Sequence, residues 1–242
     1  MMFCTWMRRL VRRRIALETP VANDAHNNLK SECYGYGRWD ASYWFIGLEQ
    51  GQSLLENDDS TLRNRAFLEL NHDGLCDCED FHRKIQELRW HRKLPKAKLQ
   101  PTWRSLLLLL KSFEGKPSDL ESLREYQRCR WGKSDGETCV IELSGAPSHN
   151  FKGIAVEGAL LQKRLQFMDS KISACKPRFV VIYGKSQWDI WKKFWGDRLL
   201  PVKGRTEIFQ LGPTWVAFTK SPTAFGVSND HWIDLGRQLV EL

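Results

Sequence analysis

The chain has 242 residues, of which 42% are hydrophobic and 11 are tryptophan. This length and composition predict a folded protein with one sizeable core and exclude a largely disordered chain. No apolar run reaches the roughly 18 residues that span a bilayer, so we expect no membrane segment. The five leucines from Leu106 to Leu110 suit a buried helix face instead.

The formal net charge of +8 favours a polyanionic partner such as nucleic acid, although many other soluble proteins are basic. The first 14 residues contain five arginines and no acidic residue. We expect residues 1–30 to be a disordered basic segment; the alternatives are a transit peptide, a nucleic-acid-binding arm or a start codon placed too early. Residues 31–242 are expected to form a single domain.

Seven cysteines, an odd number without regular spacing, predict reduced thiols rather than a disulfide framework. A secretory signal is not apparent, because arginines interrupt the only candidate apolar stretch near the start. Both features predict a cytoplasmic, intracellular location.

Short apolar segments alternate with helical patterns along the chain. We expect strands at 43–48, 139–143, 179–183 and 215–218, with a further edge strand at 208–211. Helices are expected at 62–70, 81–92, 101–113, 118–130, 156–174, 186–195 and 230–242. Short strands that are almost continuously apolar predict a parallel sheet covered on both faces. The expected fold is therefore α/β, with three α/β/α layers and a central four-stranded, mainly parallel sheet.

Three expected loops, at 47–53, 144–153 and 219–229, leave the C-terminal ends of strands. Loops at that edge of a doubly wound sheet converge on one ligand-binding crevice. The first contains Glu49 and Gln50, the second His149 and Asn150, and the third Lys220. We therefore expect the functional site where these loops meet.

Two of the loops carry sequences that resemble motifs of the uracil-DNA glycosylase superfamily. The first is Gly47-Leu48-Glu49-Gln50-Gly51, and the second is Ser221-Pro222-Thr223-Ala224-Phe225-Gly226. The resemblance covers about residues 40–242. It implies a DNA-repair enzyme that flips uracil out of DNA and hydrolyses its N-glycosidic bond as a monomer, without a cofactor. Glu49 stands where some branches of the superfamily place the aspartate that activates water.

The sequence departs from the superfamily pattern at two positions. Ser221 replaces the histidine that stabilises charge on uracil O2, and losing one such donor costs roughly 100- to 1000-fold in turnover. Lys220 or His231 are the possible replacements. Glu142 aligns with an asparagine that reads the uracil edge; its carboxylate accepts from N3–H but cannot donate to O4 unless protonated. Asn150 or His149 are the candidate donors.

The resemblance thus gives three groups of candidate site residues. The catalytic candidates are Glu49, Gln50 and Ser221, and the substrate-binding candidates are Gly47, Leu48, Gly51, Glu142, His149 and Asn150. The DNA-binding candidates are Ser53, Ser148, Lys220, Thr223, Phe225 and Ser228. Phe225 is either a wedge inserted into the base stack or an aromatic side chain folded onto the core.

Two alternatives to the glycosylase remain. One is a catalytically weak or inactive relative that binds DNA or damaged bases, which Ser221 favours. The other is a hydrolase of another substrate, using Glu49 and His149, although the chain has no Gly-x-Ser-x-Gly nucleophile elbow.

His72-x3-Cys76-x-Cys78-x3-His82 offers ligand types that suit zinc. Its Cys-x-Cys centre is not the common Cys-x2-Cys spacing, so we expect no metal at the functional site. Some superfamily members bind an iron–sulfur cluster through a set that includes a Cys-x2-Cys pair near the N-terminus. That pair is absent here, so we expect no cluster.

Overall fold

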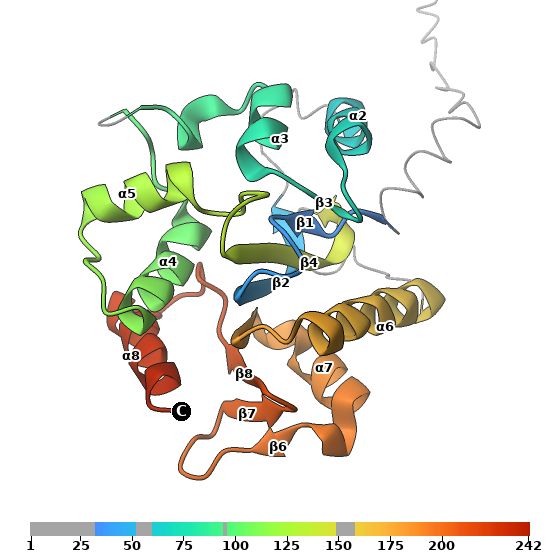
Figure 1. The fold of residues 1–242 in the computed structure, drawn as a ribbon, viewed down its shortest axis with the longest axis vertical. Coiled ribbons are helices and arrows are strands. Elements are labelled where there is room, and N and C mark those ends of the chain that lie inside the picture. The colour runs from blue at the N-terminus through green and yellow to red at the C-terminus, as the bar shows by residue number, and fades with distance from the viewer. Residues whose placement is uncertain (1–31, 52–59, 94–95, 149–157) are drawn as a thin grey trace, which may run out of the picture.

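A mixed β-sheet runs through the middle of the molecule (Figure 1). The computed structural model describes residues 32–51, 60–93, 96–148 and 158–242, and the side chains of 49–51, 60–61 and 146–148 are outside this description. Within these ranges eight strands form the order β3-β1-β4-β2-β5-β8-β7-β6. They are β1 (Gly35–Tyr36), β2 (Tyr43–Gly51), β3 (Leu75–Cys76), β4 (Thr138–Ser148), β5 (Phe179–Tyr183), β6 (Leu200–Pro201), β7 (Ile208–Leu211) and β8 (Thr214–Thr219).

The four expected main strands are the centre of this sheet. β4, β2, β5 and β8 are neighbours in that order, and each pair is parallel. The edge strand expected at 208–211 is β7, which pairs antiparallel with β8. The sheet is nevertheless larger than the expected four strands and only partly parallel, because β1 pairs antiparallel with β4 and because β3 and β6 form the outer margins. β1, β3 and β6 are only two residues long, too short to show a periodic pattern in the sequence.

Helices cover both faces of the sheet, which confirms the α/β class (Figure 1). One hydrophobic cluster joins alternate strand residues, such as Phe45 and Val181, to helices on one face. These helices are α2 (Ser60–Leu70), α3 (Cys78–Lys84), α4 (Pro101–Phe113), α5 (Leu120–Cys129) and α8 (Asn229–Val240). A second cluster joins the intervening residues, such as Ile46 and Val180, to α6 (Gly158–Cys175) and α7 (Trp188–Trp195).

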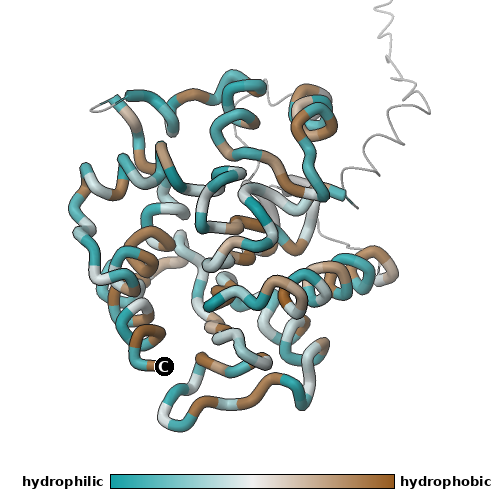
Figure 2. The backbone as a smooth tube through the Cα atoms, viewed as in Figure 1, coloured by the Kyte–Doolittle hydropathy of each residue, from teal (hydrophilic) through white to brown (hydrophobic). Residues whose placement is uncertain are grey.

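The helix sequences suit this layering. Hydrophobic and hydrophilic segments alternate along α6 in Figure 2, and its residues Leu165, Met168 and Ile172 are buried. This is the spacing of one apolar helix face. In the described part of the chain, no helix is both long and apolar enough to cross a membrane.

The expected helix at 81–92 is instead two shorter elements. α3 begins early, at Cys78, because the Asp77 carboxylate accepts hydrogen bonds from the backbone N–H groups of Glu79 and Asp80. The helix ends at Lys84, and Gln86 adopts a positive φ of 62°. A 3-10 turn, η1 (Leu88–Trp90), follows; two others, η3 (Lys185–Gln187) and η4 (Gly196–Arg198), flank α7.

β2 and β4 are also longer than expected. Residues 49–51 and 144–148 were expected in loops, but they extend the two strands beside each other. Glu49 pairs with Ser144 and Gly51 with Ser148, and the register shifts between these two pairs. Continued parallel pairing therefore overrides the glycine-rich, polar composition that predicted loops here. Residues 1–31 and 52–59 lie outside the described part of the chain.

α8 packs closely on α4 at Gly236. A Cβ atom at this position would lie 2.3 Å from the carbonyl oxygen of Leu109 and 2.9 Å from Cβ of Ser112. The Ser112 hydroxyl donates a hydrogen bond of 2.8 Å to the carbonyl oxygen of Ile233, so the two helices also share a polar contact. Glycine at 236 therefore sets how near the two helices approach.

Replacing Gly236 by alanine should destabilise the protein by about 1–3 kcal/mol, because the added methyl group must push the two helix backbones apart. The measurement is the free energy of unfolding from urea titration. Gly158→Ala is the matched control, since a Cβ atom there meets nothing within 4 Å and alanine favours a helix. Equal stability of the two variants would contradict the close approach.

Candidate functional site

The direction in which the chain adds strands to the sheet reverses between β2 and β5. Across the sheet, the four parallel strands occur in the chain order second, first, third, fourth. β2 pairs with β5 only from Tyr43 to Ile46, whereas its pairing with β4 continues to Gly51. The two strands therefore part at Gly47. In open α/β sheets, such a switch point, at the carboxyl ends of the strands, is where ligands bind.

A row of four residues crosses the sheet at this switch point. Gly47 pairs with Glu142, and Tyr183 pairs with Thr219. Gly47 and Tyr183 each follow directly on the paired residues Ile46 and Ile182, so the four positions share one row. We call Glu142, Gly47, Tyr183 and Thr219 the polar row. It lies on the face of the sheet that α4 and α8 cover.

The side chains of Glu142 and Tyr183 meet above Gly47. The Tyr183 hydroxyl donates a hydrogen bond of 3.1 Å to Oε1 of Glu142. A Cβ atom at position 47 would lie 2.0 Å from Oε2 of Glu142 and 2.5 Å from the Tyr183 hydroxyl. Only glycine leaves room for this contact. Burial, and then the neighbouring Glu142, raise the pKa of Tyr183, so its hydroxyl remains a donor at neutral pH.

Gln187 ties the ends of β2 and β5 together. Its side chain is fully buried, and Nε2 donates to the carbonyl oxygens of Ile46 at 3.2 Å and Tyr183 at 2.7 Å. Its Oε1 accepts from the indole N–H of Trp191 at 3.0 Å. Because each polar atom of the amide is bonded, the strand ends that carry the polar row have a fixed spacing.

Arg164, from α6, braces the end of β4 from the other face of the sheet. Nε donates to the carbonyl oxygen of Leu143 at 2.7 Å, and Nη2 donates to that of Glu142 at 2.8 Å. The guanidinium also lies 4.1 Å from the ring centroid of Tyr34. Only 1% of Arg164 is exposed, and this burial lowers its pKa. The side chain therefore places a buried positive charge behind the polar row.

His231, from α8, reaches the end of β8. Its Nε2 lies 2.7 Å from Oγ1 of Thr219, the last member of the polar row. Burial lowers the pKa of His231, so the imidazole is neutral at pH 7. Ser221 lies two residues beyond Thr219, and its Oγ is 3.2 Å from Oγ1 of Thr223. An imidazole thus stands at the end of β8, although residue 221 is serine.

The structure brings only part of the expected site into view. Gly47 and Glu142 belong to the polar row, and Glu49 follows Gly47 by two residues on β2. Leu48 packs instead on the hydrophobic cluster under α6 and α7, so its side chain does not face the row. The side chains of Glu49, Gln50, Gly51 and Ser148 lie outside the description, as do the whole residues Ser53, His149 and Asn150.

The expected DNA-contacting residues of the third loop have different surroundings. The Phe225 side chain is fully exposed, so it does not fold onto the core. Lys220 and Thr223 are also exposed. Ser228 caps α8 by accepting a hydrogen bond of 3.4 Å from the backbone N–H of His231. Its role in the structure is therefore to begin that helix, and DNA contact by Ser228 stays a prediction.

Sequence reasoning missed Tyr183, Gln187, Thr219 and Arg164 as members or braces of this site. Tyr183 ends an apolar strand segment and resembles a core residue there. Its phenol was nevertheless a signal, because a buried tyrosine hydroxyl needs a hydrogen-bond partner. Arg164 gave a similar signal, as a cation within the buried stretch of a helix.

The suggested zinc pattern does not form one site. His72 is exposed, and the thiol of Cys76 donates to the carbonyl oxygen of Gly35 at 3.6 Å. Cys78 and His82 do face each other, with Sγ and Nδ1 3.5 Å apart. Two of the four suggested ligands are therefore together, and two are not.

Neither a protein-family model nor a curated protein sequence matches the chain. Function is therefore inferred from the residues and geometry of the molecule itself.

The contact above Gly47 predicts coupling between two substitutions. Gly47→Ala should destabilise the protein by about 1–3 kcal/mol by crowding the Glu142–Tyr183 contact. Tyr183→Phe should cost a similar amount, because it removes a hydrogen bond to a carboxylate. The double variant should be at least about 0.5 kcal/mol more stable than the summed effects of the two single substitutions predict, since removing the hydroxyl makes room for the methyl group. If the two changes in unfolding free energy were additive in the double variant, this geometry would be contradicted.

Proposed function

We propose that the chain is a DNA-repair glycosylase that hydrolyses the N-glycosidic bond of uracil in DNA. The observation that carries the proposal is the polar row at the sheet's switch point, where β2 and β5 part at Gly47. The strand ends that carry the two motif-like sequences, β2 and β8, both contribute to this row. A flipped base would enter at this edge.

Glu142 and Tyr183 suit recognition of a uracil edge. The carboxylate of Glu142 accepts from uracil N3–H, but it has no hydrogen for the O4 carbonyl. The Tyr183 hydroxyl, 3.1 Å from that carboxylate, supplies the missing donor when N3–H takes its place at Glu142. Cytosine, with an acceptor at N3 and an amino group at position 4, mismatches both groups.

Glu49 is the water-activating carboxylate in this proposal. It lies two residues beyond Gly47 on β2, roughly 7 Å along the strand. In this proposal the carboxylate acts at the sugar rather than at the base. There it orients water toward C1′ and stabilises the positive charge that develops as the glycosidic bond breaks.

His231 takes the role that Ser221 leaves vacant. Its neutral imidazole stands at the end of β8 through the 2.7 Å contact with Thr219. A neutral imidazole can donate a hydrogen bond to the uracil oxygen on which negative charge develops. The proposal thus exchanges a loop histidine for one supplied by the first turn of α8.

DNA would lie over the third loop. Lys220 is exposed beside the polar row and can contact a phosphate, and the fully exposed Phe225 can wedge between bases. The net charge of +8 favours such a polyanionic partner. The protein acts as a monomer on uracil-containing DNA and uses no cofactor for this reaction.

Ser221 favours a second candidate function, a relative that binds DNA or damaged bases with little or no catalysis. Its hydroxyl contacts Thr223, and a serine hydroxyl is a weaker electrostatic partner for a departing anion than imidazole. In that case the fold and the basic surface would serve only to bind DNA or damaged bases.

The test is cleavage of a uracil-containing oligonucleotide, read as strand scission after alkali treatment. The wild-type chain should release uracil, and Glu49→Gln should do so at least about 100-fold more slowly, because general-base catalysis contributes that much. Glu121→Gln, at an exposed glutamate of α5, is the matched control and should retain full activity. Oligonucleotides with cytosine in place of uracil should remain intact.

Three outcomes decide between the candidates. Scission that depends on Glu49 supports the glycosylase. Tight DNA binding without scission in any variant overturns it and supports the binding protein. Equal scission by wild type and Glu49→Gln would contradict the role given to Glu49.

A further inference from the structure

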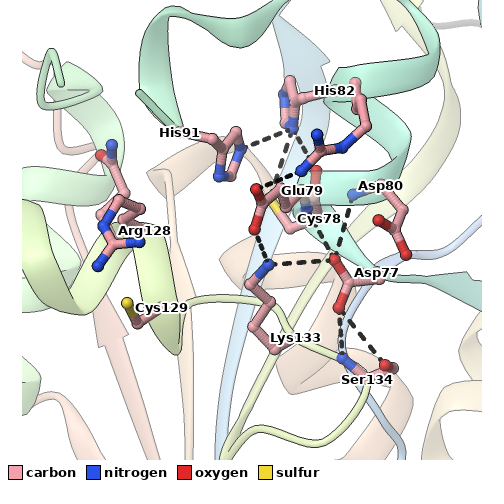
Figure 3. A network of polar contacts seen from close by, with 12 residues as sticks. Asp77, Cys78, Glu79, Asp80, His82, His91, Arg128, Cys129, Lys133 and Ser134 are labelled. Atoms are coloured by element: carbon pink, nitrogen blue, oxygen red, sulfur yellow. Dashed lines mark hydrogen bonds and ion pairs between the residues drawn. The ribbon is translucent and has the colours of Figure 1, made fainter. Parts of the chain in front are cut away.

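Three potential metal ligands lie together beside α3 and η1, away from the polar row (Figure 3). Cys78 begins α3, His82 follows one helical turn later, and His91 comes directly after η1. Their ligand atoms all lie within 4.8 Å of one another. The three residues are 0%, 6% and 8% exposed. We call them the Cys78 cluster.

Hydrogen bonding among the described residues leaves one buried nitrogen of this cluster without a partner. Nδ1 of His82 lies 2.6 Å from the carbonyl oxygen of Cys78, 3.3 Å from Nε2 of His91 and 3.5 Å from Sγ of Cys78. A neutral imidazole nitrogen carries at most one hydrogen and donates in one in-plane direction, so it cannot serve all three neighbours. Nδ1 of His91 is buried and lacks a hydrogen-bond partner among the described residues. A buried polar atom without a hydrogen-bond partner is costly.

The two separations that involve Nδ1 of His82 match those expected between ligands of a tetrahedral ion, and all three ligand atoms lie within 4.8 Å of one another. Zinc lies about 2.3 Å from cysteine sulfur and about 2.0–2.1 Å from histidine nitrogen. At tetrahedral angles these bond lengths separate two nitrogens by about 3.3 Å, and a nitrogen from a sulfur by about 3.5 Å. The observed separations are 3.3 Å between the two imidazole nitrogens and 3.5 Å between Nδ1 of His82 and Sγ.

We propose that Cys78, His82 and His91 bind one divalent transition-metal ion, with zinc as the cation that suits one thiolate and two imidazoles. The ligand atoms are Sγ of Cys78, Nδ1 of His82 and Nε2 of His91. Both imidazoles are buried, and burial favours the neutral form that ligates a metal ion. On binding, the thiol loses its proton to solvent, and the hydrogen of His82 moves to Nε2.

Water takes the fourth coordination position. Glu79, on α3, is engaged elsewhere, because its two oxygens are held by Arg83, at 2.7 Å from Oε1, and by Lys133 at Oε2 (Figure 3). Asp77 is engaged as the cap of α3 and by Ser134. Three protein ligands with one open position therefore describe the site.

The Cys78 cluster is separate from the proposed catalytic edge, and its metal does not depend on the glycosylase proposal. The backbone N–H of Cys78 donates to the carbonyl oxygen of Gly132 at 2.9 Å, and Gly132 in turn donates to Thr138, the first residue of β4. Glu142 lies four residues further along β4, roughly 13 Å away. The ion would fasten η1 and the seven-residue α3 near the amino end of β4.

The test is zinc binding by the full chain after chelator treatment, measured by metal analysis and by competition with a chromophoric chelator. Cys78→Ser and His91→Gln should each weaken binding by at least about tenfold, because even outer-shell changes at metal sites cost that much. Cys129→Ser and His72→Gln are the matched controls; both residues are exposed and outside the cluster. Each control should retain one zinc ion per chain.

Cobalt substitution of the wild-type chain gives a readout that does not depend on a variant folding. Bound Co²⁺ should show the absorption of a tetrahedral centre together with a thiolate charge-transfer band. A chain that retains no zinc or cobalt overturns the proposal. So does unchanged zinc affinity in His91→Gln, or a cobalt spectrum without the thiolate band.

Discussion

The site depends on the close approach of Glu142 and Tyr183 across Gly47. This contact requires a residue without a side chain at the point where β2 leaves β5, because a Cβ atom would lie 2.0 Å from the carboxylate. Gln187 fixes the distance between the two strand ends, and Arg164 holds the end of β4 from the opposite face. The fully hydrogen-bonded amide of Gln187 and the buried guanidinium of Arg164 thus preorganise this edge of the sheet, while exposed residues of the third loop can meet a ligand.

Much of the fold follows from local pattern. The apolar segments at 43–48, 139–143, 179–183 and 215–218 are the four parallel strands, since strands buried on both faces are almost wholly apolar. The edge strands β1, β3 and β6 have two residues each, and only long-range pairing creates them. The continuation of β2 through Gly51 has the same origin, because Glu49 and Gly51 read as loop residues until β4 lies beside them.

The sequence predicted where in the fold the candidate site lies, but not which side chains meet there. The rule that ligands bind at the carboxyl ends of strands led to the loop that begins at Gly47, and the superfamily resemblance led to Glu142. The structure pairs these two residues across β2 and β4. Neither the rule nor the resemblance could show that Tyr183 turns its hydroxyl to Glu142, or that His231 reaches Thr219, because residues 41 and 12 positions apart meet only in the folded chain. For the same reason, the sequence indicated only two of the three residues of the Cys78 cluster. Cys78 and His82 share a helix face, whereas His91 joins them through the unexpected break after Lys84.

Hydrogen exchange of the full chain, with and without an oligonucleotide containing uracil, tests most directly whether the polar row is the base-binding site. We expect slower exchange at the ends of β2, β4, β5 and β8 and in the loop at 220–228, and unchanged exchange in α3 and η1. Protection confined to other surfaces, or no protection at saturating oligonucleotide, would contradict it.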